Sequence, residues 1–219
     1  MQKYLPRNDN KQLLIFLSAL VIVLLLIAYI LFEDSQLSFL LWNLFLAWVP
    51  LLILYVVGAL PKRLLNKFVA AALVIMWAIF YPNAPYMITA LLHTPLTIRQ
   101  IGLSVNILSW LKFSIMFISF WLGILLTYYS LYPIHSNISS KVSKTVGTAA
   151  IIFISFISAY GIYLGRFPRL NSWDLFFNPS RVISIIRSSF NLDTLVFVLL
   201  FGLMIYLIYT SLYRIKHNK

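Results

Sequence analysis

The sequence predicts an all-α membrane protein, a single integral membrane domain over residues 1–219 that forms a bundle of about six transmembrane helices with short extracytoplasmic interfacial helices. Composition is the first observation behind this prediction. The 219 residues are 62% hydrophobic and 10% charged, with a mean hydropathy of +0.92, whereas a soluble domain has roughly 25% charged residues. Such a chain cannot cover itself with polar surface, so its predicted solvent is the lipid bilayer.

Six apolar segments are the second observation, because about 20 apolar residues cross a bilayer as a helix. They cover residues 13–32, 39–60, 68–81, 105–131, 147–164 and 192–212. The first resembles a signal peptide, but it exceeds the usual apolar region of roughly 7–15 residues and no small-residue cleavage site follows it. We therefore predict an uncleaved span. The third is short unless the chain continues into the membrane past Pro82.

The excess of basic residues is the third observation. Seventeen Lys and Arg stand against five Asp and Glu. We interpret this excess as a topology signal and not as nucleic-acid binding, because the bases lie mainly in short loops between apolar runs. The eleven on one side are Lys3, Arg7, Lys11, Lys62, Arg63, Lys67, Lys141, Lys144, Arg214, Lys216 and Lys219, and the five on the other are Arg99, Arg166, Arg169, Arg181 and Arg187. The seventeenth, Lys112, lies inside the fourth span near the second side.

The side with more basic residues should be cytoplasmic. This predicts a multi-pass protein of the inner (plasma) membrane with both termini in the cytoplasm. It also puts two polar motifs, residues 82–86 and 166–179, together on the extracytoplasmic side.

The first polar motif, Pro-Asn-Ala-Pro-Tyr, occupies residues 82–86 at the end of the third span. Proline donates no backbone hydrogen bond and disfavours helix in the preceding residue. The motif therefore predicts a helix break, with Asn83 as the cap of a new short helix over residues 86–92. It is either a structural turn or the floor of a cavity that offers Asn83, Tyr86 and His93, since irregular backbone at membrane depth needs protein or a water-filled cavity around it.

The second motif, residues 160–179, has the most varied polar groups in the chain. Gly161 and Gly165 are one helical turn apart and predict close packing against a neighbouring helix. Asn178 is a predicted cap before Pro179, and residues 180–188 have the pattern of a short amphipathic interfacial helix.

Two arginines give this motif its chemistry. Arg166 and Arg169 either reach toward lipid headgroups or bind a phosphate or carboxylate in bidentate fashion. Beside them, Asn171 and Trp173 suit a phosphorylated lipid or an anionic sugar. Asn171 is also a predicted helix cap, with Asp174 reaching back to it in a variant of the capping box. Three roles therefore stay open for Asp174: helix capping, orienting an arginine, and acting as a base.

Several classes of site are excluded by what the sequence lacks. With no cysteine, few acids and three distant histidines, His93, His135 and His217, an ordinary metal site lacks ligands, and we expect no metal and no cofactor. No nucleophile elbow, P-loop or Rossmann glycine pattern is present. No acid lies inside a span, which disfavours a proton-coupled transporter. Asn43, inside the second span, is predicted as an interhelical hydrogen-bond donor.

Together, the two motifs resemble those of a family of bacterial multi-pass membrane proteins known as domain of unknown function 1361. The resemblance rests on residues 82–86, 161–167, 169, 171–174 and 178–179, and extends from about the second span to the last. It implies a bacterial inner-membrane protein and supplies no activity. Members commonly carry an acidic residue after the threonine of the first motif, where this chain has Ala90. A family mechanism that used that carboxylate would be lost here or would depend on Asp174.

These observations favour recognition of an anionic lipid or another lipid-linked or phosphate-bearing ligand at the outer leaflet. Arg166 and Arg169 would hold the anion, and the positioning residues would be Asn83, Tyr86, Asn171 and Trp173. Catalysis stays open, with His93 or Asp174 as the general base of an enzymatic version. The alternatives are a non-catalytic scaffold subunit in envelope assembly, whose protein partner the sequence does not identify, and a small-solute transporter.

Overall fold

The computed structural model describes residues 2–33, 37–61, 63–93 and 107–217. Within these ranges the chain forms helices and no strand, and six helical segments are long and apolar enough to cross a membrane. The predicted class is confirmed, and the protein is a multi-pass helical membrane protein. The elements are η1 (Gln2–Tyr4), α1 (Asn8–Phe32), α2 (Phe39–Ala59), α3 (Lys67–Phe80), α4 (Asn83–Tyr86), η2 (Met87–His93), α5 (Ile107–Lys141), α6 (Lys144–Arg166), α7 (Asp174–Phe177), α8 (Pro179–Ser188) and α9 (Leu192–His217).

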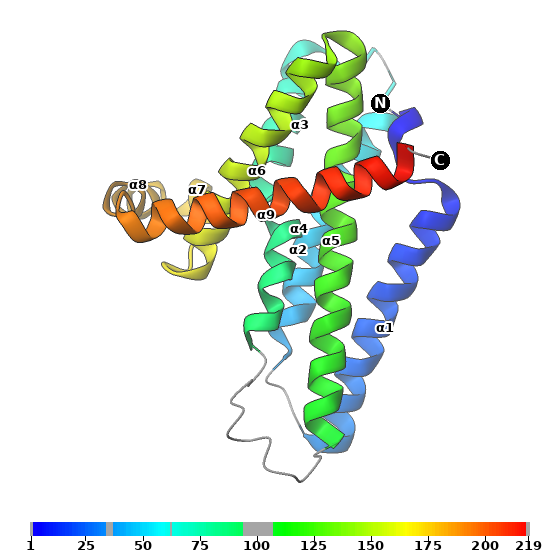
Figure 1. Ribbon diagram of the computed structural model, residues 1–219, viewed down its shortest axis with the longest axis vertical. Helices are drawn as coiled ribbons and strands as arrows, with labels where there is room; N and C mark the ends of the chain where they lie inside the picture. The colour runs from blue at the N-terminus through cyan, green and yellow to red at the C-terminus, as the bar shows by residue number, and fades with distance from the viewer. Residues whose placement is uncertain (1, 34–36, 62, 94–106, 218–219) are drawn as a thin grey trace.

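Helix α5 is the element on which most others pack (Figure 1). It has 35 residues, and at about 1.5 Å per residue it exceeds the hydrocarbon core of a bilayer, which is roughly 30 Å thick. Helices α1, α2 and η2 pack against it, as does α6, while α9 packs against α6 and runs across α5 (Figure 1). The two termini lie near each other (Figure 1).

Helix α1 buries only a small part of its apolar surface against the rest of the protein. Its buried residues are Leu14, Val21, Leu25 and Ala28, which fall on one face at helical spacing and contact α5. From Leu13 onward the other faces of the helix are almost as apolar but largely exposed, with Ile30 at 70%. In a bilayer this exposure costs little, because lipid tails are as apolar as leucine.

The fourth span is longer than predicted. The sequence indicates an end at Leu131, but α5 continues through Pro133 and His135 to Lys141. His135 is buried, and its Nδ1 lies 2.7 Å from the hydroxyl oxygen of Tyr209 on α9. A buried polar group with a hydrogen-bond partner avoids most of its desolvation penalty, so this polar stretch stays helical inside the bundle.

The third span continues past Pro82, as its short apolar run suggested. Helix α3 has 14 residues, and the chain goes on through α4 and η2, which pack against α5. Met87, Thr89 and Ala90 are buried in this contact. Gly123 of α5 permits it, because a Cβ atom at that position would lie 2.6 Å from the Cβ of Met87.

The remaining spans begin and end within about a turn and a half of the predicted boundaries. The predicted start of the fourth span, residue 105, lies outside the described residues. So do Lys62, Arg99 and Lys219, three of the basic residues on which the predicted orientation rests.

Candidate functional site

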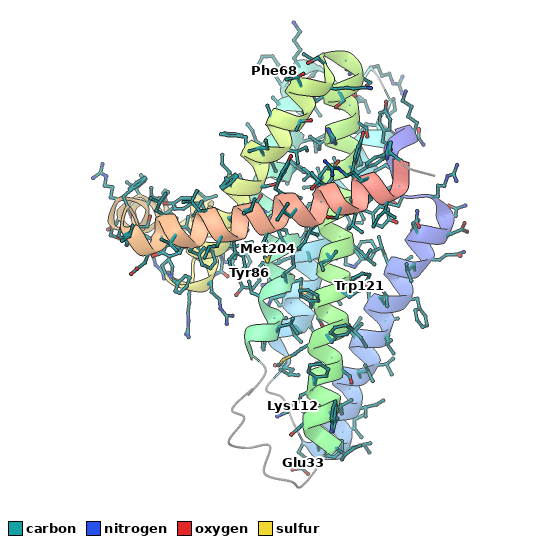
Figure 2. The ribbon with its side chains drawn as sticks, viewed as in Figure 1. Glu33, Phe68, Tyr86, Lys112, Trp121 and Met204 are labelled. Atoms are coloured by element: carbon teal, nitrogen blue, oxygen red, sulfur yellow. The ribbon has the colours of Figure 1, made fainter. Side chains whose placement is uncertain are left out.

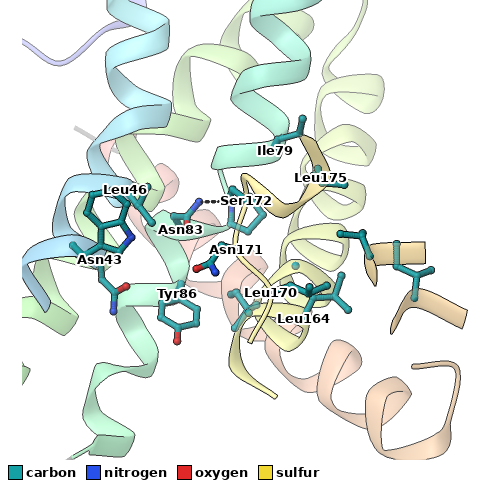
Figure 3. A pocket seen from close by; sticks show the side chains of 17 residues that line it. Asn43, Leu46, Ile79, Asn83, Tyr86, Leu164, Leu170, Asn171, Ser172 and Leu175 are labelled. Carbon is teal, nitrogen blue, oxygen red and sulfur yellow. Dashed lines mark hydrogen bonds between the residues drawn. The ribbon is translucent and has the colours of Figure 1, made fainter. Parts of the chain in front are cut away.

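The two polar motifs meet at a cavity of about 190 Å³. Tyr86, one of its lining residues, lies near the middle of the long axis, between Phe68 toward one end and Glu33 toward the other (Figure 2). The walls come from the beginning of α2, the α3–α4 junction, the end of α6, and α7 and α8 with the segment before them (Figure 3). The lining residues are Trp42, Asn43, Leu46, Ile79, Pro82, Asn83, Tyr86, Gly161, Ile162, Leu164, Gly165, Leu170, Asn171, Ser172, Leu175, Val182 and Ile186.

Asn83 joins the two motifs. Its side-chain Nδ2 donates to the Phe80 carbonyl at the end of α3 (2.9 Å) and to the Ser172 hydroxyl oxygen (3.0 Å; Figure 3). The prediction that Asn83 caps the following helix is wrong, because α4 begins after Pro82 without a side-chain cap. Ala84 N–H bonds to the Tyr81 carbonyl, which leaves the Phe80 carbonyl for the side chain of Asn83.

Two glycines bring α6 against the proline break. A Cβ atom on Gly161 would lie 2.9 Å from the Cγ of Pro82, so only glycine fits there without displacement. A Cβ atom on Gly165 would lie 3.6 Å from the Tyr86 ring, an ordinary contact distance. The predicted close packing at these glycines is confirmed, and the partner is the broken end of the third span.

A tight loop after α6 presents Asn171 to the cavity. Arg169 adopts a left-handed backbone conformation (φ 55°), and Leu170 N–H then returns to the Leu164 carbonyl (3.0 Å). The carboxylate of Asp174, only 5% exposed, accepts a hydrogen bond from Asn171 N–H (2.7 Å). Asp174 therefore reaches back as predicted.

The predicted side-chain caps at Asn171 and Asn178 are wrong. The residue before α7 is Trp173, and α7 has no side-chain cap. Asn178 precedes α8 and its side chain makes no cap bond, although Pro179 occupies the first turn as expected. The Asn171 side chain is instead exposed and lines the cavity (Figure 3).

The structure brings together only part of the predicted binding set. Asn83, Tyr86 and Asn171 line the cavity. Trp173 packs edge-on against Trp42, a lining residue, with ring centroids 5.6 Å apart.

The two arginines and the two proposed bases are not among the described lining residues. Arg166 is half-buried at the end of α6, and Arg169 is exposed in the loop. Asp174 is buried against the Asn171 backbone. His93 ends η2, and its side chain lies outside what the structure describes.

Asn43 and Ser172 are lining residues that the sequence did not assign to the site. No hydrogen bond of the Asn43 side chain occurs among the described residues, so the predicted interhelical bond is not found. The position of Asn43 near the start of α2 could have indicated that it belongs to the site. Two consecutive spans run in opposite directions, so the start of α2 should lie level with the end of α3.

The described lining of the cavity is neutral, and four arginines are chain neighbours of lining residues. No charged side chain is among its described lining residues. Arg166 adjoins Gly165 and Arg169 adjoins Leu170 in the chain, while Arg181 and Arg187 are exposed on α8. Asp174, the acidic residue of this segment, is turned to the backbone of Asn171.

The family model described as "Protein of unknown function (DUF1361)" matches residues 42–208, and the chain belongs to this family. The matched region contains both polar motifs and the whole lining of the cavity. No curated protein and no solved structure matches the chain.

Replacing Gly161 by alanine should destabilise the fold, since the added methyl group would push against the rigid ring of Pro82. We expect a loss of about 1–3 kcal/mol, the usual cost of overpacking. Gly165→Ala is the matched control: it adds the same methyl group at a normal distance and should be neutral or stabilise by up to about 1 kcal/mol through helix propensity. Equilibrium unfolding in detergent measures both, and equal effects would contradict this packing.

Proposed function

We propose that this membrane protein binds an anionic amphiphile, a lipid-linked or phosphate-bearing molecule, with part of its polar head in the cavity between the two motifs. The observation that carries the proposal is the convergence of three amides. Asn43, Asn83 and Asn171 come from α2, the proline break and the loop after α6, and line one cavity with Tyr86 and Ser172.

The cavity chemistry supports a neutral hydrogen-bonding group inside. The side-chain amides of Asn43 and Asn171 have both donors and an acceptor, and a hydroxyl group can do either. Both N–H groups of Asn83 already bond to Phe80 and Ser172, so Asn83 offers its amide oxygen as an acceptor. Hydroxyl, amide or ester groups of a lipid head can satisfy such a set. A phosphate, which only accepts when fully ionised, would leave the amide oxygens without donors.

The size of the cavity supports an amphiphile and not a whole small molecule. Its 190 Å³ is below the roughly 300–1,000 Å³ of ordinary ligand pockets. Only a fragment can enter. Trp42 and Leu175 line the cavity and are about half exposed, so the remainder of the ligand could lie on apolar surface in the bilayer.

The arginines after the cavity wall would hold the anionic part. Arg166 and Arg169 each follow or precede a lining residue directly, and guanidinium groups bind phosphate in bidentate fashion. Trp173 would act indirectly, through its contact with Trp42. Catalysis is not part of the proposal, because Asp174 is engaged by the Asn171 backbone.

We expect purified protein to retain anionic lipid when phosphatidylglycerol is supplied in mixed nanodiscs with phosphatidylcholine. Arg166→Gln with Arg169→Gln should lower retention about tenfold, since a hydrogen bond to a charged group contributes about 1.5–3 kcal/mol. Asn43→Leu should lower it too if the head enters the cavity. Arg214→Gln, an exposed arginine at the end of α9, is the matched control. Native mass spectrometry provides the readout, and equal retention in all variants would refute the proposal.

The proposed site lies on the extracytoplasmic side, with both termini in the cytoplasm. The chain has no cysteine, so single cysteines report accessibility without background. Ser180→Cys, exposed on α8, should react with a membrane-impermeant maleimide in intact cells. Thr145→Cys, exposed at the start of α6, should react only after permeabilisation. The reverse pattern would invert the orientation and contradict an outer-leaflet ligand.

A further inference from the structure

A second and larger hollow, of about 740 Å³, lies along α6 and α9. Both helices present one face to it at helical spacing, and the turn between α8 and α9 closes one end. We call it the α6–α9 groove. Its lining residues are Phe153, Phe156, Ile157, Tyr160, Ser189, Phe190, Asn191, Leu192, Thr194, Leu195 and Val198.

The few polar groups of the groove bond to one another or to the backbone. The Tyr160 hydroxyl lies 2.7 Å from the Ser189 hydroxyl, which also donates to the Ile186 carbonyl (2.7 Å). The Asn191 side-chain oxygen accepts from the backbone N–H and the hydroxyl of Thr194 (2.9 and 3.0 Å). The groove therefore offers a ligand mainly carbon surface.

The shape of the groove is fixed by the contact between its two helices. Gly202 of α9 lies against the ring of Phe156, where a Cβ atom would be 2.5 Å from the ring. Phe156 is thus held in place by close packing. The packing of α6 against α9 therefore sets the shape of the α6–α9 groove.

The length of the groove suits a hydrocarbon chain. Its α6 wall extends from Phe153 to Tyr160, eight residues or about 12 Å of helix. Half the bilayer core is about 15 Å, which is the length available to an acyl chain in one leaflet. A transmembrane helix of a protein partner would need a matching face along about 30 Å.

The charge at the closed end suits an anionic headgroup. Arg187 is exposed in the last turn of α8, two residues before the groove lining begins at Ser189. Arg181 is exposed one and a half turns earlier on the same helix. Asp193 is the acidic residue nearest in the chain among those described, and it does not line the groove.

We propose that the α6–α9 groove binds one hydrocarbon chain of an anionic membrane lipid, whose headgroup phosphate is held by Arg187. This goes beyond the cavity proposal and does not depend on it, because the groove and the cavity share no lining residue.

The test uses phosphatidylglycerol with a photoreactive diazirine in its acyl chain, full-length protein in nanodiscs, and peptide mapping of the cross-links. We expect labelling to concentrate on residues 153–160 and 189–198. Leu195→Trp should fill the groove and reduce labelling there at least fivefold. Leu203→Trp is the matched control, on the same helix with a similar exposed fraction (49% against 54%), and should leave labelling unchanged. Ile157→Trp fills the groove from α6 if Leu195→Trp fails to fold.

The headgroup is tested with the same probe built on phosphatidylcholine. Wild type should prefer the anionic probe, and Arg187→Gln should remove that preference while Arg214→Gln keeps it. Asn43→Leu should not change groove labelling, so the cavity proposal can fail separately. Uniform labelling around the apolar surface, equal labelling in Leu195→Trp and Leu203→Trp, or no lipid label on this face would each overturn the proposal.

Discussion

The side-chain amide of Asn83 is the interaction on which the site depends. Two prolines break the third span inside an apolar bundle, and a carbonyl left without a donor there would cost several kcal/mol. Asn83 satisfies the Phe80 carbonyl with one bond and ties the break to Ser172 with another. The helix break and the loop after α6 therefore form one wall, and glycine at position 161 lets them meet.

The fold class, the spans and the meeting of the two motifs could be predicted from the sequence, because each depends on composition, length and the parity of the spans. The partners of Asn83 could not. Residue propensity predicts that an asparagine before a short helix caps the N-terminus of that helix. Here the surroundings have a low dielectric constant, and the side chain instead donates to the Phe80 carbonyl of the preceding helix. The same limitation applies to Arg169, whose position relative to the cavity follows from its left-handed backbone conformation in the loop after α6.

The buried face of α1 and the end of α5 could not be predicted from the sequence either, for a different reason. Hydrophobic periodicity indicates a buried face only when the other face is wet, and both faces of α1 are apolar. The end of α5 was misplaced because Pro133 and His135 are typical of a loop. The bond between His135 and Tyr209 offsets their polarity, and it joins residues 74 positions apart, which no local pattern reveals.

The most direct test of the claim that the two motifs form one site is a double-mutant cycle on Asn83→Ala and Ser172→Ala, read by equilibrium unfolding in detergent. Because their side chains share a hydrogen bond of 3.0 Å, the account predicts a coupling energy of about 0.5–1.5 kcal/mol. Additive effects, with a coupling near zero, would mean that this hydrogen bond does not join the motifs and would contradict the account.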